Sequence, residues 1–74
     1  MTFELETEYI ELYKLLKVVS LCSSGGEAKH AIDSGLVNVN GVIETRRRCK
    51  IRVGDRILFG DDTPEEILVV QAAE

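Results

Sequence analysis

The chain lacks tryptophan and has only two cysteines in 74 residues. A core without tryptophan must be built mainly from leucine, isoleucine and valine, each of which contributes about 1.5–3 kcal/mol when fully buried. A secreted domain of this size would usually carry four or more cysteines as disulfides. We therefore expect Cys22 and Cys49 to be free thiols in a reducing cytosol, with a single bridge between them as the alternative.

Motifs typical of catalysis, metal binding, nucleotide hydrolysis and membrane insertion are also missing. His30 has no evident catalytic partner, and one histidine with two cysteines is no recognisable metal-ligand set. Gly25-Gly26 belongs to no phosphate loop or Gly-x-Gly-x-x-Gly motif, so nucleotide hydrolysis has no support. The longest apolar run, residues 67–70, is far shorter than a membrane span, and the acidic start is unlike a signal peptide. We expect a cytoplasmic, non-catalytic protein with no cofactor, metal or membrane partner.

The net charge of −4 conceals a separation of charge along the chain. Residues 1–11 hold four acids and no base, and residues 61–74 hold five acids and no base. The centre, residues 12–60, holds the other four of 13 acids and all nine bases, so its local charge is 9 − 4 = +5. Charges more than about 8–10 Å apart are largely screened, so an acidic protein can still present a positive face. We interpret residues 1–74 as one domain with acidic segments at its ends.

Residues 9–19 have the spacing of an amphipathic helix. One apolar stripe is formed by residues at i, i+3, i+4 and i+7, namely Leu12, Leu15, Leu16 and Val19. Lys14 and Lys17 fall outside the stripe and should face solvent.

A second helix should begin after Ser24, which forms a capping box with Glu27. We expect the Ser24 hydroxyl to reach the Glu27 amide and the Glu27 carboxylate to reach back. Gly35 stands where a left-handed residue ends a helix. After it the period changes to two, and Asn40-Gly41 predicts a type I′ hairpin turn.

Further strands are predicted in the second half of the chain. In residues 49–53, Cys49, Ile51 and Val53 should point inward, while Lys50 and Arg52 point outward. Strands are also expected over residues 56–59 and 66–71. The order predicts an α+β domain with two N-terminal helices followed by a small, mainly antiparallel sheet of four or five short strands.

The segment from Arg46 to Arg56 contains six bases and one acid among eleven residues. Arginine forks bind phosphates in a bidentate manner. The alternative is a charged strand edge that prevents aggregation, but three consecutive arginines exceed that need. Gly25-Gly26 offers free helix amides to an anion, and Lys29 either adds charge there or pairs with Asp33.

Three stretches carry a family resemblance: Ser-Gly-Gly-Glu-Ala-Lys from Ser24, residues 35–41 with Val-Asn-Val-Asn-Gly, and Gly54-Asp55. Over residues 9–60 the chain resembles the αL RNA-binding domain first known from small-subunit ribosomal protein S4, most closely the stand-alone bacterial YbcJ-like type. Many relatives have an arginine at the start of the first helix, where this chain has Glu11-Leu12.

The resemblance implies binding of structured RNA, often ribosomal or transfer RNA, through the two helices and the start of the hairpin. We also expect a monomer, associated with the ribosome. The residues of the predicted RNA site are Lys14, Lys17, Ser23, Ser24, Gly25, Gly26, Lys29, Asn40, Arg46, Arg47, Arg48, Lys50 and Arg52. No aromatic accompanies the arginines in sequence, which favours recognition of shape and phosphate. Replacing the three consecutive arginines by alanine should then remove most RNA affinity with little loss of stability. The rival hypothesis is a ribosome-associated adaptor that docks an acidic protein.

Overall fold

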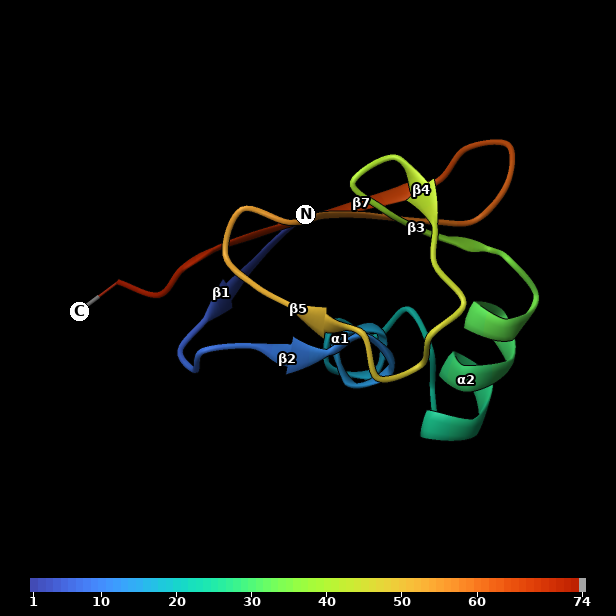
Figure 1. Ribbon diagram of the computed structural model, residues 1–74, viewed down its shortest axis with the longest axis horizontal. Coiled ribbons are helices and arrows are strands. Elements are labelled where there is room, and N and C mark those ends of the chain that lie inside the picture. Colours follow the sequence, from blue (N-terminus) through green and yellow to red (C-terminus); the bar gives the residue numbers. More distant parts are fainter. Residues whose placement is uncertain (74) are drawn as a thin grey trace.

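The computed structural model describes residues 1–73 and arranges them as a sheet with two helices on one side of it (Figure 1). The helices are α1 (Leu12–Val18) and α2 (Gly25–Asp33). The main sheet contains β1 (Thr2–Leu5), β3 (Val37–Val39), β4 (Val42–Ile43), β6 (Arg56–Phe59) and β7 (Glu65–Gln71). A separate two-stranded ribbon is formed by β2 (Ile10–Glu11) and β5 (Lys50–Ile51), and α1 begins directly after β2.

The main sheet has the strand order β1-β7-β6-β3-β4. Its pairs are antiparallel except β1 with β7, which run parallel. The α+β class is confirmed, but the helices are not N-terminal, because β1 and β2 precede them. The signal for β1 was the alternation of Phe3 and Leu5 with Thr2 and Glu4, which is a strand pattern inside the acidic segment.

The core lies between the helices and the covered face of the sheet. Strand residues alternate between faces, so Ile67 and Val69 are buried while Leu68 is exposed. The buried side chains that meet there include Leu12, Leu15, Leu16, Ala28 and Ile32 from the helices and Val37, Ile57, Ile67 and Val69 from the strands. The predicted leucine stripe of the first helix is confirmed in its first three members.

Helix α1 begins three residues later than predicted, because Ile10 and Glu11 pair with β5 instead. Its N-terminus has no side-chain cap. The Leu12 amide donates to the Cys49 carbonyl at 2.9 Å, and the Tyr13 amide donates to the Arg47 carbonyl at 3.1 Å. First-turn amides have no partner inside a helix, so the loop that carries the arginines supplies their acceptors. The loop and the helix are thereby held together.

Helix α2 has half of the predicted capping box. The Ser24 Oγ accepts from the Glu27 amide at 3.1 Å, as expected. The Glu27 carboxylate, however, turns to Ser23, whose Oγ donates to it at 2.7 Å and whose amide donates at 3.4 Å. Gly35 has a φ of 79°, which confirms the left-handed residue after the helix.

The hairpin turn between β3 and β4 is confirmed, because Asn40 and Gly41 have φ values of 52° and 87°. The predicted alternation of residues 49–53 is only partly right. Ile51 is fully buried, but Val53 is 46% exposed. The reason is that β5 ends at Ile51 and residues 52–55 form a turn, in which the Asp55 amide donates to the Arg52 carbonyl at 3.1 Å, so the alternation stops.

Candidate nucleic-acid interface

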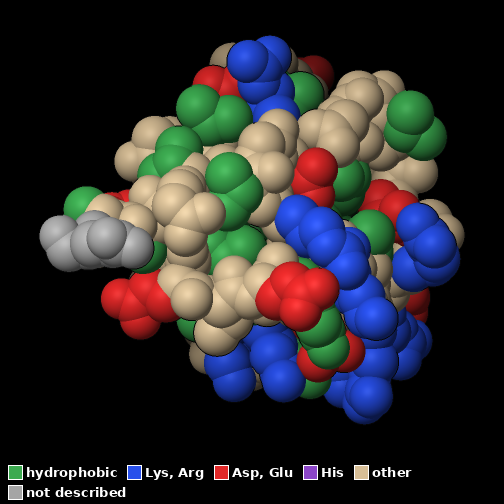
Figure 2. Space-filling view, turned by 60° about the vertical axis from the view of Figure 1, so that its left-hand side comes forward, with side chains coloured by type: hydrophobic (Ala, Val, Ile, Leu, Met, Phe, Trp, Pro, Cys, Tyr) green, Lys and Arg blue, Asp and Glu red, His purple; other side chains and the backbone are tan. Residues whose placement is uncertain are grey.

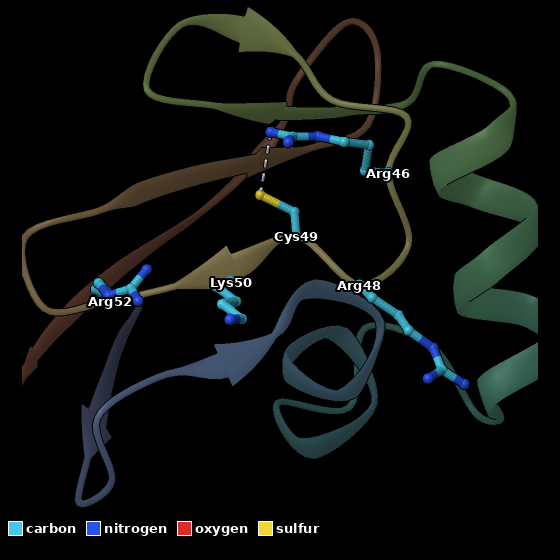
Figure 3. Close-up of a pocket in the computed structure, with 5 residues that line it drawn as sticks. All are labelled: Arg46, Arg48, Cys49, Lys50 and Arg52. Carbon is cyan, nitrogen blue, oxygen red and sulfur yellow. Dashed lines mark hydrogen bonds between the residues drawn. The ribbon is translucent and has the colours of Figure 1, made fainter.

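One open pocket gathers four of the predicted cations (Figure 3). Its volume is about 450 Å³, and we call it the basic pocket. It is lined by Arg46, Arg48, Cys49, Lys50 and Arg52. The loop between β4 and β5 supplies the first three residues, β5 supplies Lys50, and Arg52 follows β5. Figure 3 shows Arg46 over the Cys49 sulfur, with Arg48 extending away from it on the other side of the loop.

Arg46 is held by a carboxylate two residues before it. Its Nε donates to Glu44 Oε2 at 3.0 Å, and its Nη2 donates to Oε1 at 2.9 Å. The Arg46 amide donates to Oε2 as well, at 3.0 Å. Hydrogen bonds from the side chain and then the backbone of Arg46 lower the pKa of Glu44 to about 2. Glu44 is therefore charged at any physiological pH and orients the guanidinium.

Arg47 connects the loop to α2. Its Nε donates to Asp33 Oδ1 at 3.1 Å, and its Nη2 donates to Oδ2. The hydrogen bonds from this guanidinium lower the pKa of Asp33. The predicted alternative of a Lys29–Asp33 pair is thus wrong, since Arg47 occupies the carboxylate. Lys29 lies instead with its Nζ 5.0 Å from the centroid of the Tyr13 ring.

Glu11, just before α1, forms ion pairs with two cations. Its carboxylate lies 3.2 Å from Lys14 Nζ and 3.8 Å from Arg48 Nε. The hydrogen bond to Glu11 raises the pKa of Lys14. Glu11 therefore links the start of α1 to the loop that carries Arg48.

The N-terminus of α2 offers free backbone amides to an anion, but the Glu27 carboxylate already lies beside it. The Glu27 carboxylate lies against Ser23, where an incoming anion would be attracted. A Cβ on Gly25 would lie 3.9 Å from the Tyr13 ring, an ordinary van der Waals contact, so the ring packs beside the helix entry without requiring glycine there. Ser24 and Gly26 are exposed beside it.

Two residues of the predicted RNA site lie outside the basic pocket and its ion pairs. Lys17 is exposed on α1 and makes no ion pair or ring contact among residues 1–73. The side-chain Nδ2 of Asn40 donates to Asp55 Oδ1 at 3.0 Å, and its Oδ1 accepts from the Arg56 backbone amide at 2.9 Å. Asn40 therefore ties two turns together, and it lines a different hollow from the basic pocket.

Sequence reasoning missed two tyrosines. Lys50 Nζ and the Arg52 guanidinium carbon lie 5.0 and 5.8 Å from the centroid of the Tyr9 ring. Lys14 and Lys29 flank the Tyr13 ring at 5.9 and 5.0 Å. The absence of an aromatic beside the basic segment holds only along the sequence, because the pairing of β2 with β5 brings Tyr9 beside Lys50 and Arg52. Two tyrosines four residues apart, outside the leucine stripe, were the signal that could have found them.

The two thiols are free, as predicted. Burial raises the pKa of both Cys22 and Cys49, which keeps them protonated and poorly nucleophilic. Among residues 1–73 no cluster of three or more His, Cys, Asp or Glu side chains could hold a metal ion. None of the described helices is long and apolar enough to cross a membrane.

The surface around the pocket is a mixture of both charges. Figure 2 shows lysine and arginine side chains gathered along the lower right and bottom of the molecule, with acidic side chains between them. Near the pocket, Arg46, Arg47 and Arg48 each pair with a carboxylate of the protein itself.

A sequence profile of the S4 domain matches residues 3–69, which is most of the chain. The chain belongs to the S4 domain family. This S4 domain is 47% identical over 51 residues to the "Putative RNA-binding protein YbcJ" of Escherichia coli K12, an alignment that covers 69% of the chain and 73% of the relative. An uncharacterized YbcJ protein of Shigella flexneri matches to the same extent.

A solution structure of Escherichia coli YbcJ has the same architecture. It superposes on this S4 domain with a TM-score of 0.65 and 40% identity, over 90% of the chain and 85% of YbcJ. That structure is described as revealing an αL motif involved in RNA binding. The family resemblance inferred from the sequence is thus confirmed.

Proposed function

We propose that this S4 domain is a non-catalytic module that binds structured RNA, of the ribosomal or transfer type, through the basic pocket and the adjoining start of α1 and N-terminus of α2. The observation that carries the proposal is the gathering of Arg46, Arg48, Lys50 and Arg52 around one pocket in a protein of net charge −4. The description of YbcJ as an RNA-binding protein supports it. The proposed setting is a cytoplasmic monomer that associates with the ribosome.

The geometry suits recognition of phosphates on a folded RNA. The deep major groove of an RNA helix is closed to side chains, so proteins bind such helices mostly by shape and backbone contacts. The loop that carries the arginines is anchored to the first turn of α1 by two backbone hydrogen bonds. A phosphate therefore meets a loop of fixed backbone, on which the Arg46 guanidinium is already oriented by Glu44. Arg46 gives two N–H groups to Glu44 and keeps others for an RNA oxygen.

A salt titration with an RNA hairpin tests this function. Displacement of counterions from about five phosphates should make the logarithm of affinity fall with the logarithm of salt concentration at a slope near −4. Arg48→Ala should make that slope shallower by about one and weaken binding. Arg56→Ala is the matched control, because Arg56 pairs with Glu66 on the main sheet and does not line the basic pocket.

Three results would contradict the proposal. They are an affinity without a salt slope, an equal loss in the two variants, and binding to an acidic peptide that is tighter than binding to the hairpin. The last result would favour the acidic-partner hypothesis instead.

A further inference from the structure

The ribbon of β2 and β5 presents one face to solvent and one to the core. Ile10 pairs with Ile51, and Glu11 pairs with Lys50. Ile51 is fully buried, so Lys50 must point to the opposite, outer face. Extending the antiparallel register by one step brings Tyr9 opposite Arg52. The outer face therefore carries the Tyr9 ring beside Lys50 and Arg52, with the Glu11 carboxylate next along β2, although Tyr9 is about 40 residues from the two cations in sequence.

Tyr9 differs from the other aromatic side chains in its exposure. It is 38% exposed, whereas Phe3, Tyr13 and Phe59 are half-buried and pack against the core. Its backbone is held, since the Thr7 hydroxyl donates to the Tyr9 carbonyl at 2.8 Å. The ring itself is contacted by the ends of Lys50 and Arg52, which are long and exposed.

The same two cations connect the ring to the basic pocket. Lys50 and Arg52 line the pocket and also lie 5.0 and 5.8 Å from the Tyr9 ring centroid. An RNA strand whose phosphates occupy the pocket would bring its next base to the ring. Because both cationic side chains are flexible, a base can take their place on the ring while they move to the flanking phosphates.

We propose that Tyr9 stacks on one unpaired base of the RNA, with Lys50 and Arg52 contacting the phosphates on either side of it. The inference rests on the proposed RNA-binding function and specifies its target, which becomes an RNA stem that adjoins a single-stranded segment. Stacking of a base on an aromatic side chain is tolerant of sequence, because every base has a π face. The site therefore selects an unpaired nucleotide without selecting its identity.

The test compares a blunt RNA duplex with the same duplex extended by three unpaired nucleotides, at the 3′ end in one set of duplexes and at the 5′ end in another. The wild-type protein should bind one extended duplex about 5- to 30-fold more tightly than the blunt one. Tyr9→Leu should bring this ratio close to one, and Tyr9→Phe should preserve it. Abasic nucleotides in the extension should also bring the ratio of the wild-type protein close to one, which requires no variant.

A second readout follows the stack itself. With 2-aminopurine in the extension, the wild-type protein and Tyr9→Phe should quench its fluorescence, whereas Tyr9→Leu should leave it nearly unchanged. A ratio that survives in Tyr9→Leu, or in the abasic RNA, overturns the inference. If the blunt duplex binds with the expected salt slope and the extensions add nothing, only the stacking site is refuted. If neither RNA binds, the proposed function fails as well.

Discussion

Two groups of cations lie only a few residues apart, yet they are held in different ways. Arg46, Arg47 and Arg48 each contact a carboxylate of the protein, whereas Lys50 and Arg52 lie against the Tyr9 ring and make no ion pair within residues 1–73. Carboxylates orient Arg46, Arg47 and Arg48 and partly compensate their charge. Lys50 and Arg52 have no carboxylate partner there and are less restrained. The basic segment therefore combines a positioned group with an uncompensated one.

The difference changes what the arginine run is expected to do. The Arg46 side chain is bonded to Glu44, and the Arg47 side chain is bonded to Asp33 of α2. We therefore now expect replacement of all three arginines to cost stability as well as RNA affinity. This revises the expectation drawn from the sequence, in which their side chains had no partners within the protein.

The largest effect should come from removing the buried side chain beneath Lys50 and Arg52. Ile51→Ala deletes a fully buried side chain under the ribbon, and such changes cost about 2–5 kcal/mol. Lys50→Ala, at the adjacent outward position, should change the free energy of unfolding by less than about 0.5 kcal/mol. Urea denaturation of both variants measures the difference. Equal losses would mean that the ribbon does not depend on its buried face.

The next effect concerns RNA affinity. Lys50→Ala combined with Arg52→Ala removes two uncompensated charges, so affinity for an RNA hairpin should fall roughly 10- to 100-fold at low salt, and the salt slope should become shallower by about two. Fluorescence anisotropy at several salt concentrations provides the measurement. Thermal unfolding should match the wild type. An unchanged slope would assign the phosphate contacts to Arg46, Arg47 and Arg48 alone.

A smaller effect should follow when the first group loses its carboxylates. Asp33→Asn with Glu44→Gln leaves Arg47 and Arg46 uncompensated, so affinity for the same hairpin should rise about 2- to 5-fold at low salt and much less at high salt, where screening is stronger. The control is Glu66→Gln, which releases Arg56 away from the pocket. A fall in affinity would show that orientation by the carboxylates matters more than the charge they neutralise.

The smallest effect is a loss of stability at acid pH, below the physiological range. The folded pKa of Glu44, about 2, is below its ordinary value of 4.5, and the pKa of Asp33 is lowered too. Their ion pairs therefore stabilise the fold above about pH 4.5, and this contribution is lost as the pH falls through the folded values. Melting temperatures measured from pH 8 to 2 should decline less steeply at the acid end for Glu44→Gln than for the wild type. Divergence between pH 5 and 8 would contradict the assignment.

Much of the local structure followed from short patterns. The leucine stripe of α1, the Ser24 cap and the Asn40-Gly41 turn each depend on residues within a few positions, so the sequence contains the whole of their physical cause. Strand β1 was missed because its partner, β7, lies more than 60 residues away. Its alternating pattern is short, and the acids within it are equally typical of a charged terminal segment.

For the candidate site, residue type and local charge were readable in advance, and the αL resemblance of residues 9–60 pointed to RNA. The sequence by itself determined that a chain of net charge −4 concentrates its bases around residues 46–56. Only the tertiary structure decided which of those bases are compensated, because Glu11, Asp33 and the arginines meet through packing of distant segments. The same holds for Tyr9, which reaches Lys50 and Arg52 through the pairing of β2 with β5. Contacts between segments so far apart depend on the whole packed core, and no local pattern contains them.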